Sequence, residues 1–182
     1  YELTGAALPG VDSFRTPLGL ITLDNELMEK ILDDYSWINV IDQAHAEEHS
    51  LEVQLPFLQV TLNEFKIVPI VVGDADSELL AQMILKYCED DQTLIVISTD
   101  LSHYHDYQTS CDLDLRTAKT IESLSPELLF PEDACGAYPL RGSLLAAAKR
   151  NWQVHRLNLS NSGDNAGDNK LVVGYGAWII TS

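Results

Sequence analysis

The stretch LIVISTDLSHYHDY (residues 94–107) joins an apolar run to a cluster of polar side chains. Its first part, within TLIVIS (93–98), is rich in β-branched residues, which predicts a strand buried on both faces. Asp100, Ser102 and His103 follow that strand directly. Ligands of α/β proteins bind beyond the carboxyl ends of the strands, so this position favours a functional site. His103 can exchange a proton near neutral pH, and Asp100 can orient it or bind a cation.

The same polar residues also suit a purely structural role. Aspartate and serine are good turn and helix-capping residues, so Asp100 and Ser102 could cap the next helix while the histidines face solvent. The stretch alone does not separate these two interpretations.

Composition narrows the class of protein. The chain has 182 residues, which is typical of one domain with a substantial core, and 46% of them are hydrophobic. Its 11 Lys and Arg residues against 28 Asp and Glu residues give a net charge of −17, which disfavours nucleic acid and anionic membranes as partners. No apolar run approaches the roughly 20 residues of a membrane span. Three widely spaced cysteines indicate a reducing compartment, so we expect a cytoplasmic protein.

Strand and helix patterns alternate along the chain. This alternation predicts an α/β sandwich with a central mixed β-sheet, mostly buried and flanked by helices. Pro56 should kink or restart the helix that contains it, and Pro69 should place a bulge or an edge in its strand. We expect strands at 18–23, 37–41, 66–73, 93–98, 153–160 and 171–182, and helices at 24–35, 50–62, 76–90, 109–123 and 139–151.

Cys135 lies in ACGAYP (134–139), just ahead of a helix that a proline initiates. The amide dipoles at such a helix start favour a thiolate, which is a nucleophile or a soft metal ligand. The alternative is a small buried cysteine that only packs, and the local sequence offers no partner to decide between them.

The segment HAEEHSLE (45–52) spaces His45 and His49 four residues apart. That spacing resembles the zinc-binding H-E-x-x-H motif, but no glutamate follows the first histidine, and Ser50 indicates that a helix begins only after His49. We therefore favour a polar loop that carries Glu48 and His49 into a site over a zinc protease.

Five motifs occur in the same order as in one known family, and on them the chain is identified as similar to the Memo-like family, also called AmmeMemoRadiSam system protein B. This family resembles the class III extradiol ring-cleaving dioxygenases in fold. The motifs cover essentially the whole chain. They are VDSFRTPLG (11–19), EHSLEVQLPFLQ (48–59), IVISTDLSHY (95–104), CGAYPLRGSLLAA (135–147) and VGYGAWII (173–180).

The resemblance implies roles for particular residues. Cys135 matches the cysteine of a metal-site-like cluster that also uses two N-terminal histidines. Asp100 and His103 match the aspartate and the acid/base histidine of the dioxygenase-like pocket, and His49 lies in an element close to it. The implied cofactor is a divalent metal, iron first, with copper or zinc as alternatives.

This chain departs from the family pattern at its start. The H-A-G-Y and G-P-S-H motifs that carry both histidine ligands are absent. We therefore expect residues 1–182 to form a single Memo-like domain without the family's N-terminal strands, with apolar surface uncovered and metal binding weak or absent.

The sequence is compatible with two main functions and with a third that we rank below them. The first is a metal-dependent, dioxygenase-like oxidoreductase acting on a small substrate, in which His103 is the acid/base and Asp100 and His49 position the substrate. The second is a non-catalytic binding or adaptor module, for which the family name suggests an AMMECR1-like or radical-SAM protein partner. The third is metal-free thiol redox chemistry at Cys135. Either of the first two predicts that Cys135, Asp100, His103 and His49 converge on one pocket.

Overall fold

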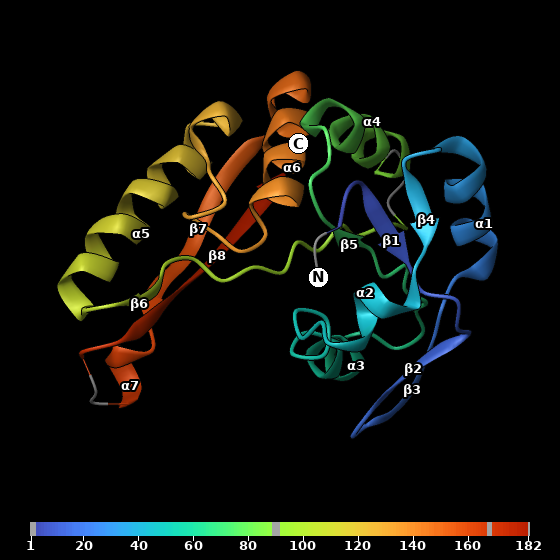
Figure 1. Cartoon of the computed structure of the whole chain (residues 1–182), viewed down its shortest axis with the longest axis horizontal. Helices are drawn as coiled ribbons and strands as arrows, with labels where there is room; N and C mark the ends of the chain where they lie inside the picture. The colour runs from blue at the N-terminus through green and yellow to red at the C-terminus, as the bar shows by residue number, and fades with distance from the viewer. Residues whose placement is uncertain (1–2, 89–91, 167–168, 182) are drawn as a thin grey trace. The chain divides into compact units, whose positions relative to one another are not determined.

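The computed structural model describes residues 3–88, 92–166 and 169–181. By its internal contacts the chain divides into two compact units, residues 1–75 and 76–182, and each is described by itself. Figure 1 labels the helices and strands of both units.

In the first unit, strand β1 (Ala6–Leu8) is the middle strand of a three-stranded sheet. It pairs in parallel with β4 (Ile38–Val40) and antiparallel with β5 (Val71–Val72). All three β1 residues are fully buried. The preceding Gly5 has a φ of +80°, and a Cβ there would lie 2.3 Å from the Trp37 carbonyl oxygen. Only glycine admits β1 so close to the β4 segment. β4 confirms the strand predicted at 37–41, whereas β1 was not predicted.

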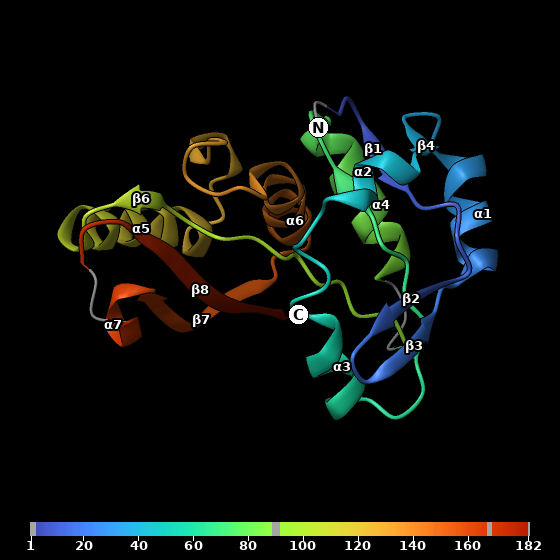
Figure 2. The ribbon, with the colours of Figure 1, turned by 60° about the horizontal axis from the view of Figure 1, so that its bottom comes forward.

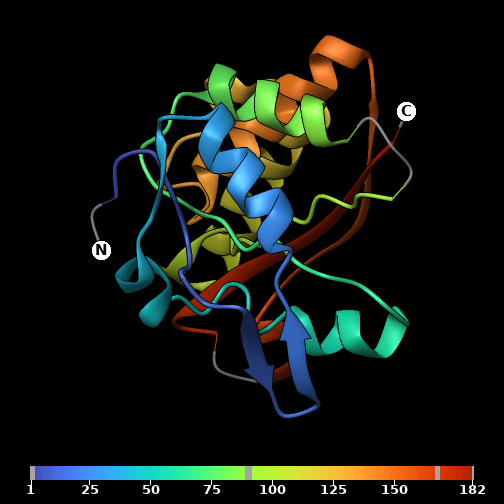
Figure 3. The ribbon, with the colours of Figure 1, turned by 90° about the vertical axis from the view of Figure 1, so that its right-hand side faces the viewer.

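A hairpin and a helix follow β1 (Figure 3). Strands β2 (Ser13–Thr16) and β3 (Gly19–Thr22) are antiparallel, and β3 confirms the strand predicted at 18–23. Helix α1 (Asn25–Asp34) confirms the helix predicted at 24–35. Its N-cap is Asp24, whose carboxylate accepts the Leu27 N–H at 3.2 Å.

Two predictions in the first unit were partly wrong. The helix expected from Ser50 begins only at α3 (Leu55–Thr61), with Pro56 in its first turn, because proline suits a helix start and opposes its continuation. Of the strand expected at 66–73, β5 pairs with β1 and Ile67 makes a single parallel bridge with Leu23. Pro69 lies between these two stretches and lacks an N–H, so the ladder is not continuous. The short helix α2 (Asp42–Ala46) lies between β4 and α3.

The second unit is built on an antiparallel sheet in the order β6-β8-β7. These strands are β6 (His103–His105), β7 (Gln153–Asn161) and β8 (Val172–Thr181), and the last two confirm the strands predicted there. Helix α5 (Tyr107–Glu122) packs against β7 and β8, as Figure 2 shows. The short helices η1 (Pro126–Leu128) and α7 (Gly163–Ala166) connect the larger elements.

Helices α4 (Ser77–Tyr87) and α6 (Ala137–Arg150) pack against each other in this unit. Both confirm predicted helices, although residues 89–90 of the first prediction lie outside the described residues. The small residues of α6 allow the axes of α4 and α6 to lie close together. A Cβ on Gly142 would lie only 2.4 Å from the Cβ of Leu80 on α4.

The strand predicted at 93–98 was wrong. Residues 93–98 belong to no strand of the described chain, and Leu94 and Val96 are 72% and 48% exposed. Ile97 still packs against the core cluster of Leu140 and Leu144. Residues 93–98 pair with no described strand, and a strand forms only where a neighbouring strand supplies the hydrogen bonds of its ladder.

The described strands thus form three small sheets, and together with the helices they confirm the α/β class. A single central sheet is not seen among them. None of the described helices combines the length and the apolar character that crossing a bilayer requires.

The α4–α6 contact yields a stability prediction. Gly142→Ala should gain up to about 1 kcal/mol in helix propensity. It should nevertheless lower the free energy of unfolding by about 1–3 kcal/mol, because the new methyl group overlaps Leu80 and forces the helices apart. Urea denaturation measures the change. Ala148→Gly, at an exposed position of the same helix, is the control and should cost only about 1 kcal/mol. A stabilised Gly142→Ala variant would contradict the close packing.

Candidate functional site

The segment that carries Asp100 and His103 is attached to β8 by backbone hydrogen bonds. The Leu101 N–H donates to the Gly174 carbonyl at 2.9 Å, and the Gly174 N–H donates to the Ser102 carbonyl at 2.8 Å. His103 then pairs with Val173 at the start of β6, where the register shifts between His103 and His105. The side chains predicted to be functional therefore sit on backbone fixed by the sheet.

A buried carboxylate reinforces this attachment. Asp114 of α5 is 2% exposed; its Oδ1 accepts the Ser102 N–H at 2.9 Å and its Oδ2 accepts the Ser110 hydroxyl at 3.0 Å. The Ser102 and Ser110 hydroxyls are 2.8 Å apart. Gly174 makes room, because a Cβ there would lie 2.0 Å from the Asp114 Oδ2. Burying a carboxylate is costly unless it is hydrogen-bonded, so this network holds α5 and the segment together.

Cys135 is brought to Asp100 by the chain that leads into α6. The Cys135 N–H donates to the Asp100 carbonyl at 3.3 Å, and the Asp100 N–H points back to the Cys135 Sγ at 3.2 Å. The Gly136 N–H donates to the Thr99 Oγ1 at 2.7 Å, and a Cβ on Gly136 would lie 2.8 Å from the Thr99 Cβ. Glycine at 136 is thus what lets the two segments meet.

Polar groups of the 99–100 segment surround the Cys135 sulfur. The sulfur is exposed and lies just ahead of the N-terminus of α6. It already faces one backbone N–H, and the Thr99 Oγ1 is 3.3 Å away. The single hydroxyl hydrogen of Thr99 can point to the Asp100 carbonyl, at 2.8 Å, or to the sulfur. A negatively charged sulfur would draw that hydrogen toward itself, because hydrogen bonds to charged acceptors are the stronger ones.

His103 and Asp100 form a loose pair. The His103 Nε2 lies 3.7 Å from the Asp100 Oδ2, and their side chains are 35% and 49% exposed. This separation exceeds a hydrogen bond, so a water molecule or a small shift would be needed for direct proton contact. Partial exposure leaves the imidazole accessible to a ligand.

The structure therefore brings together three of the four predicted site residues, Asp100, His103 and Cys135. His49 belongs to the first unit, so its convergence with them stays a prediction. It lies outside the helices, is exposed, and its Nδ1 is 2.9 Å from a Glu52 carboxylate oxygen. His45 lies within α2 and His49 beyond its end, so the pair does not share a helical face as the zinc motif requires.

Asp114 was not among the residues predicted from the sequence. A signal was present, because Ser110, Asp114, Thr117 and Ile121 occur at helical spacing and all face the interior. A carboxylate on the buried face of a helix indicates a specific polar partner.

The donors around Cys135 do not fit the metal that the resemblance implies. Within residues 3–88, 92–166 and 169–181, no three His, Cys, Asp or Glu side chains are arranged to hold a metal ion. The sulfur is approached by the Asp100 N–H, and the His103 Nε2 lies 3.7 Å from the Asp100 carboxylate. A metal at Cys135 would need further donors.

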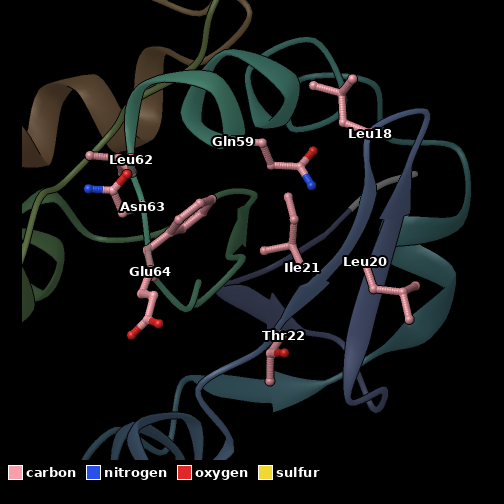
Figure 4. Close-up of a pocket in the computed structure, with 9 residues that line it drawn as sticks. Leu18, Leu20, Ile21, Thr22, Gln59, Leu62, Asn63 and Glu64 are labelled. Carbon is pink, nitrogen blue, oxygen red and sulfur yellow. The ribbon is translucent and has the colours of Figure 1, made fainter.

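A pocket of the first unit differs in its chemical groups from the cluster of Asp100, His103 and Cys135 (Figure 4). This open hollow of about 350 Å³ is lined by β3 with the preceding Leu18, by Gln59 of α3, and by residues 62–65, which follow α3. Gln59, Asn63 and Glu64 are polar groups of its wall, beside Leu18 and Leu62. The wall contains no histidine and no cysteine, so it offers hydrogen bonds but not the acid–base and thiol chemistry predicted from the sequence.

Comparison with known proteins decides the family. A family model described as Memo-like protein matches residues 3–179. The chain belongs to the Memo-like family. A MEMO1 family protein of Aquifex aeolicus is 36% identical over 178 residues, covering 90% of this chain and 65% of the relative. One from Sulfurisphaera tokodaii is 34% identical over 175 residues, covering 89% and 62%. One from Methanosarcina barkeri is 35% identical over 184 residues, covering 93% and 68%.

This Memo-like chain spans about two thirds of the length of the curated relatives it matches. The family confirms the resemblance drawn from the five motifs.

His45 is a half-buried histidine of the first unit. Its Nε2 lies 3.0 Å from the Ala7 carbonyl oxygen of β1 and so carries the hydrogen, and its ring meets Phe14 edge-on. Its Nδ1 is buried without a hydrogen-bond partner among the described residues. Burial lowers the pKa of His45 below its usual value, against smaller opposing effects of the Ala7 hydrogen bond and nearby carboxylates. Protonation would place a donor at Nδ1 with no acceptor.

This arrangement predicts a pH dependence of stability. The unfolded chain protonates His45 at a higher pH than the folded protein does. The contribution of His45 is therefore complete above 6.5, the ordinary pKa of a histidine side chain, and is lost as pH falls below it. Urea denaturation between pH 8 and pH 5.5 measures it. His45→Gln should flatten the decline, whereas His155→Gln, on exposed β7 surface, should leave it unchanged. Identical slopes for wild type and His45→Gln would contradict the assignment.

Proposed function

We propose that this chain contributes a small-molecule site in which His103 exchanges a proton with the ligand, Asp100 orients His103, and Cys135 supplies a thiol or thiolate. The observation that carries the proposal is the meeting of Cys135 with Asp100, 35 residues earlier in the chain, through reciprocal contacts of 3.2 and 3.3 Å. Groups held on fixed backbone next to a partly exposed imidazole are the usual parts of a site for general acid–base chemistry.

Each residue has a distinct task in this proposal. The Asp100 carboxylate sets the direction of the His103 ring when the two draw together. The Asp100 backbone N–H and the Thr99 hydroxyl stabilise negative charge on the Cys135 sulfur. A ligand over these groups would thus meet a proton donor or acceptor and a soft nucleophile.

The family resemblance favours the oxidoreductases as reaction class, with a class III extradiol dioxygenase-like fold and a divalent metal, iron first. Because the described donors do not fit a metal, the proposal uses none. His49 joins it as a substrate-positioning residue, as the resemblance implies.

A second candidate is a non-catalytic binding module with a protein partner. The exposed apolar side chains of Leu94, Ile95 and Val96 favour it, because large contiguous apolar surface marks protein interaction sites. The net charge of −17 would suit a basic partner. An AMMECR1-like or radical-SAM protein is the partner that the family name suggests.

Thermal shift with a library of small metabolites tests the small-molecule site. A ligand at about 100 times its dissociation constant should raise the melting temperature by roughly 5 °C or more. The gain should disappear in His103→Gln and shrink in Asp100→Asn, because both residues face the ligand. His155→Gln, at an exposed histidine of β7, is the matched control and should keep the full gain.

The outcome separates the two candidate functions. Compounds that stabilise the wild type and His155→Gln but not His103→Gln support the small-molecule site. If no stabilising compound depends on His103, the site proposal is wrong and the binding module becomes the better account.

A further inference from the structure

Tyr104 has a backbone conformation that tyrosine rarely adopts. Its φ is +58°, in the left-handed region, at the point where β6 and β8 shift register between His103 and His105. Its side chain is 72% exposed. For a bulky residue this conformation costs free energy, and glycine or asparagine would be the less strained choice.

Helix ends and core packing account for the other non-glycine residues with positive φ among those described, whereas Tyr104 lies at a register shift between two strands. Asn151 ends α6 and its N–H caps the Ala147 and Ala148 carbonyls, as an asparagine in this conformation commonly does. Leu124 follows the end of α5, and its side chain packs against the core cluster of Ile121 and Leu144. Tyr104 ends no helix and its exposed ring fills no core. Bulges and strained backbone of this kind are over-represented at functional sites.

The strained residue lies next to the acid–base pair. The ring centres of Tyr104 and His103 are 5.9 Å apart, with their planes inclined at 49°. His103 in turn lies 3.7 Å from Asp100. The register shift therefore sets an exposed aromatic face beside the imidazole of the proposed site, where a bound molecule would meet both rings.

Acidic residues are the neighbours of Tyr104 along the sequence. No lysine or arginine occurs between Lys86 and Arg116, whereas Asp100 and Asp106 flank Tyr104 in the sequence. Hydrogen bonds from the Thr109 hydroxyl and N–H lower the pKa of Asp106, which keeps it ionised at neutral pH. The face of an aromatic ring is itself electron-rich and attracts cations.

We propose that Tyr104 determines ligand specificity by stacking a planar cationic group, of the amidinium, guanidinium or pyridinium class, beside His103. The proposal rests on the small-molecule site and adds the chemical class of its ligand. A planar cation matches both the ring face and the carboxylates, whereas a planar anion would be repelled by them.

Benzamidine, benzamide and benzoate test the proposal as planar probes that are cationic, neutral and anionic. Their binding is followed by the amide chemical shifts of residues 100–106 in NMR titrations. Benzamidine should shift the His103 and Tyr104 signals with a dissociation constant at least about fivefold below that of benzamide, and benzoate should shift neither. Tyr104→Phe should bind benzamidine as the wild type does, and Tyr104→Asn should lose at least about fivefold in affinity.

The stability of the Tyr104 variants distinguishes a role of Tyr104 in ligand binding from a role in maintaining the fold. Tyr104→Asn should raise the denaturation midpoint, because asparagine accepts a positive φ with less strain. Leu124→Asn, the matched control at the other strained position, should lower it, because it removes a core side chain. Benzamidine binding that Tyr104→Asn does not weaken, equal binding of benzoate, or no benzamidine binding would overturn the proposal. Metabolites whose binding needs His103 but not Tyr104 would overturn it and leave the proposed small-molecule site standing.

Discussion

The buried carboxylate of Asp114 is the constraint on which the candidate site depends. A charge removed from water costs several kcal/mol unless hydrogen bonds replace its hydration, and here the Ser102 N–H and the Ser110 hydroxyl replace part of it. Gly174 is required on the facing strand because any side chain would occupy the carboxylate's position. Asp114 thus ties helix α5 to the segment that backbone hydrogen bonds attach to β8.

The chemistry of the site follows from that attachment. Ser102 is two residues from Asp100 and adjacent to His103, so fixing its amide also fixes the two side chains predicted to handle protons. Asp100 in turn receives Cys135 through its backbone, which gives the thiol a polar environment that its own sequence neighbours do not provide. Backbone hydrogen bonds therefore set the positions of the functional groups to a large extent. Such bonds are less sensitive to side-chain substitution than contacts between side chains are.

Local patterns predicted the helices and the long strands, because caps such as Asp24 and Asp76 and the apolar periodicity act within a few residues. Strand pairing depends on residues far away in the sequence. Local patterns therefore predicted a strand at 93–98 that is not there, and they did not predict β1. The proximity of Asp100 and Cys135 was predicted from the family resemblance, because their spacing in the sequence alone does not indicate it. The positive φ of Tyr104 has no sequence signature, because tyrosine is an unusual residue there.

The rate at which iodoacetamide alkylates Cys135 tests most directly whether Asp114 holds the site together. Peptide mass spectrometry separates Cys135 from Cys88 and Cys111, and circular dichroism establishes that each variant is folded. If Asp114 fixes the segment, Asp114→Ala should slow alkylation about tenfold, because the Asp100 N–H no longer supports the thiolate, and Ser110→Ala should give an intermediate rate. A folded Asp114→Ala protein that is alkylated at the wild-type rate would contradict the account.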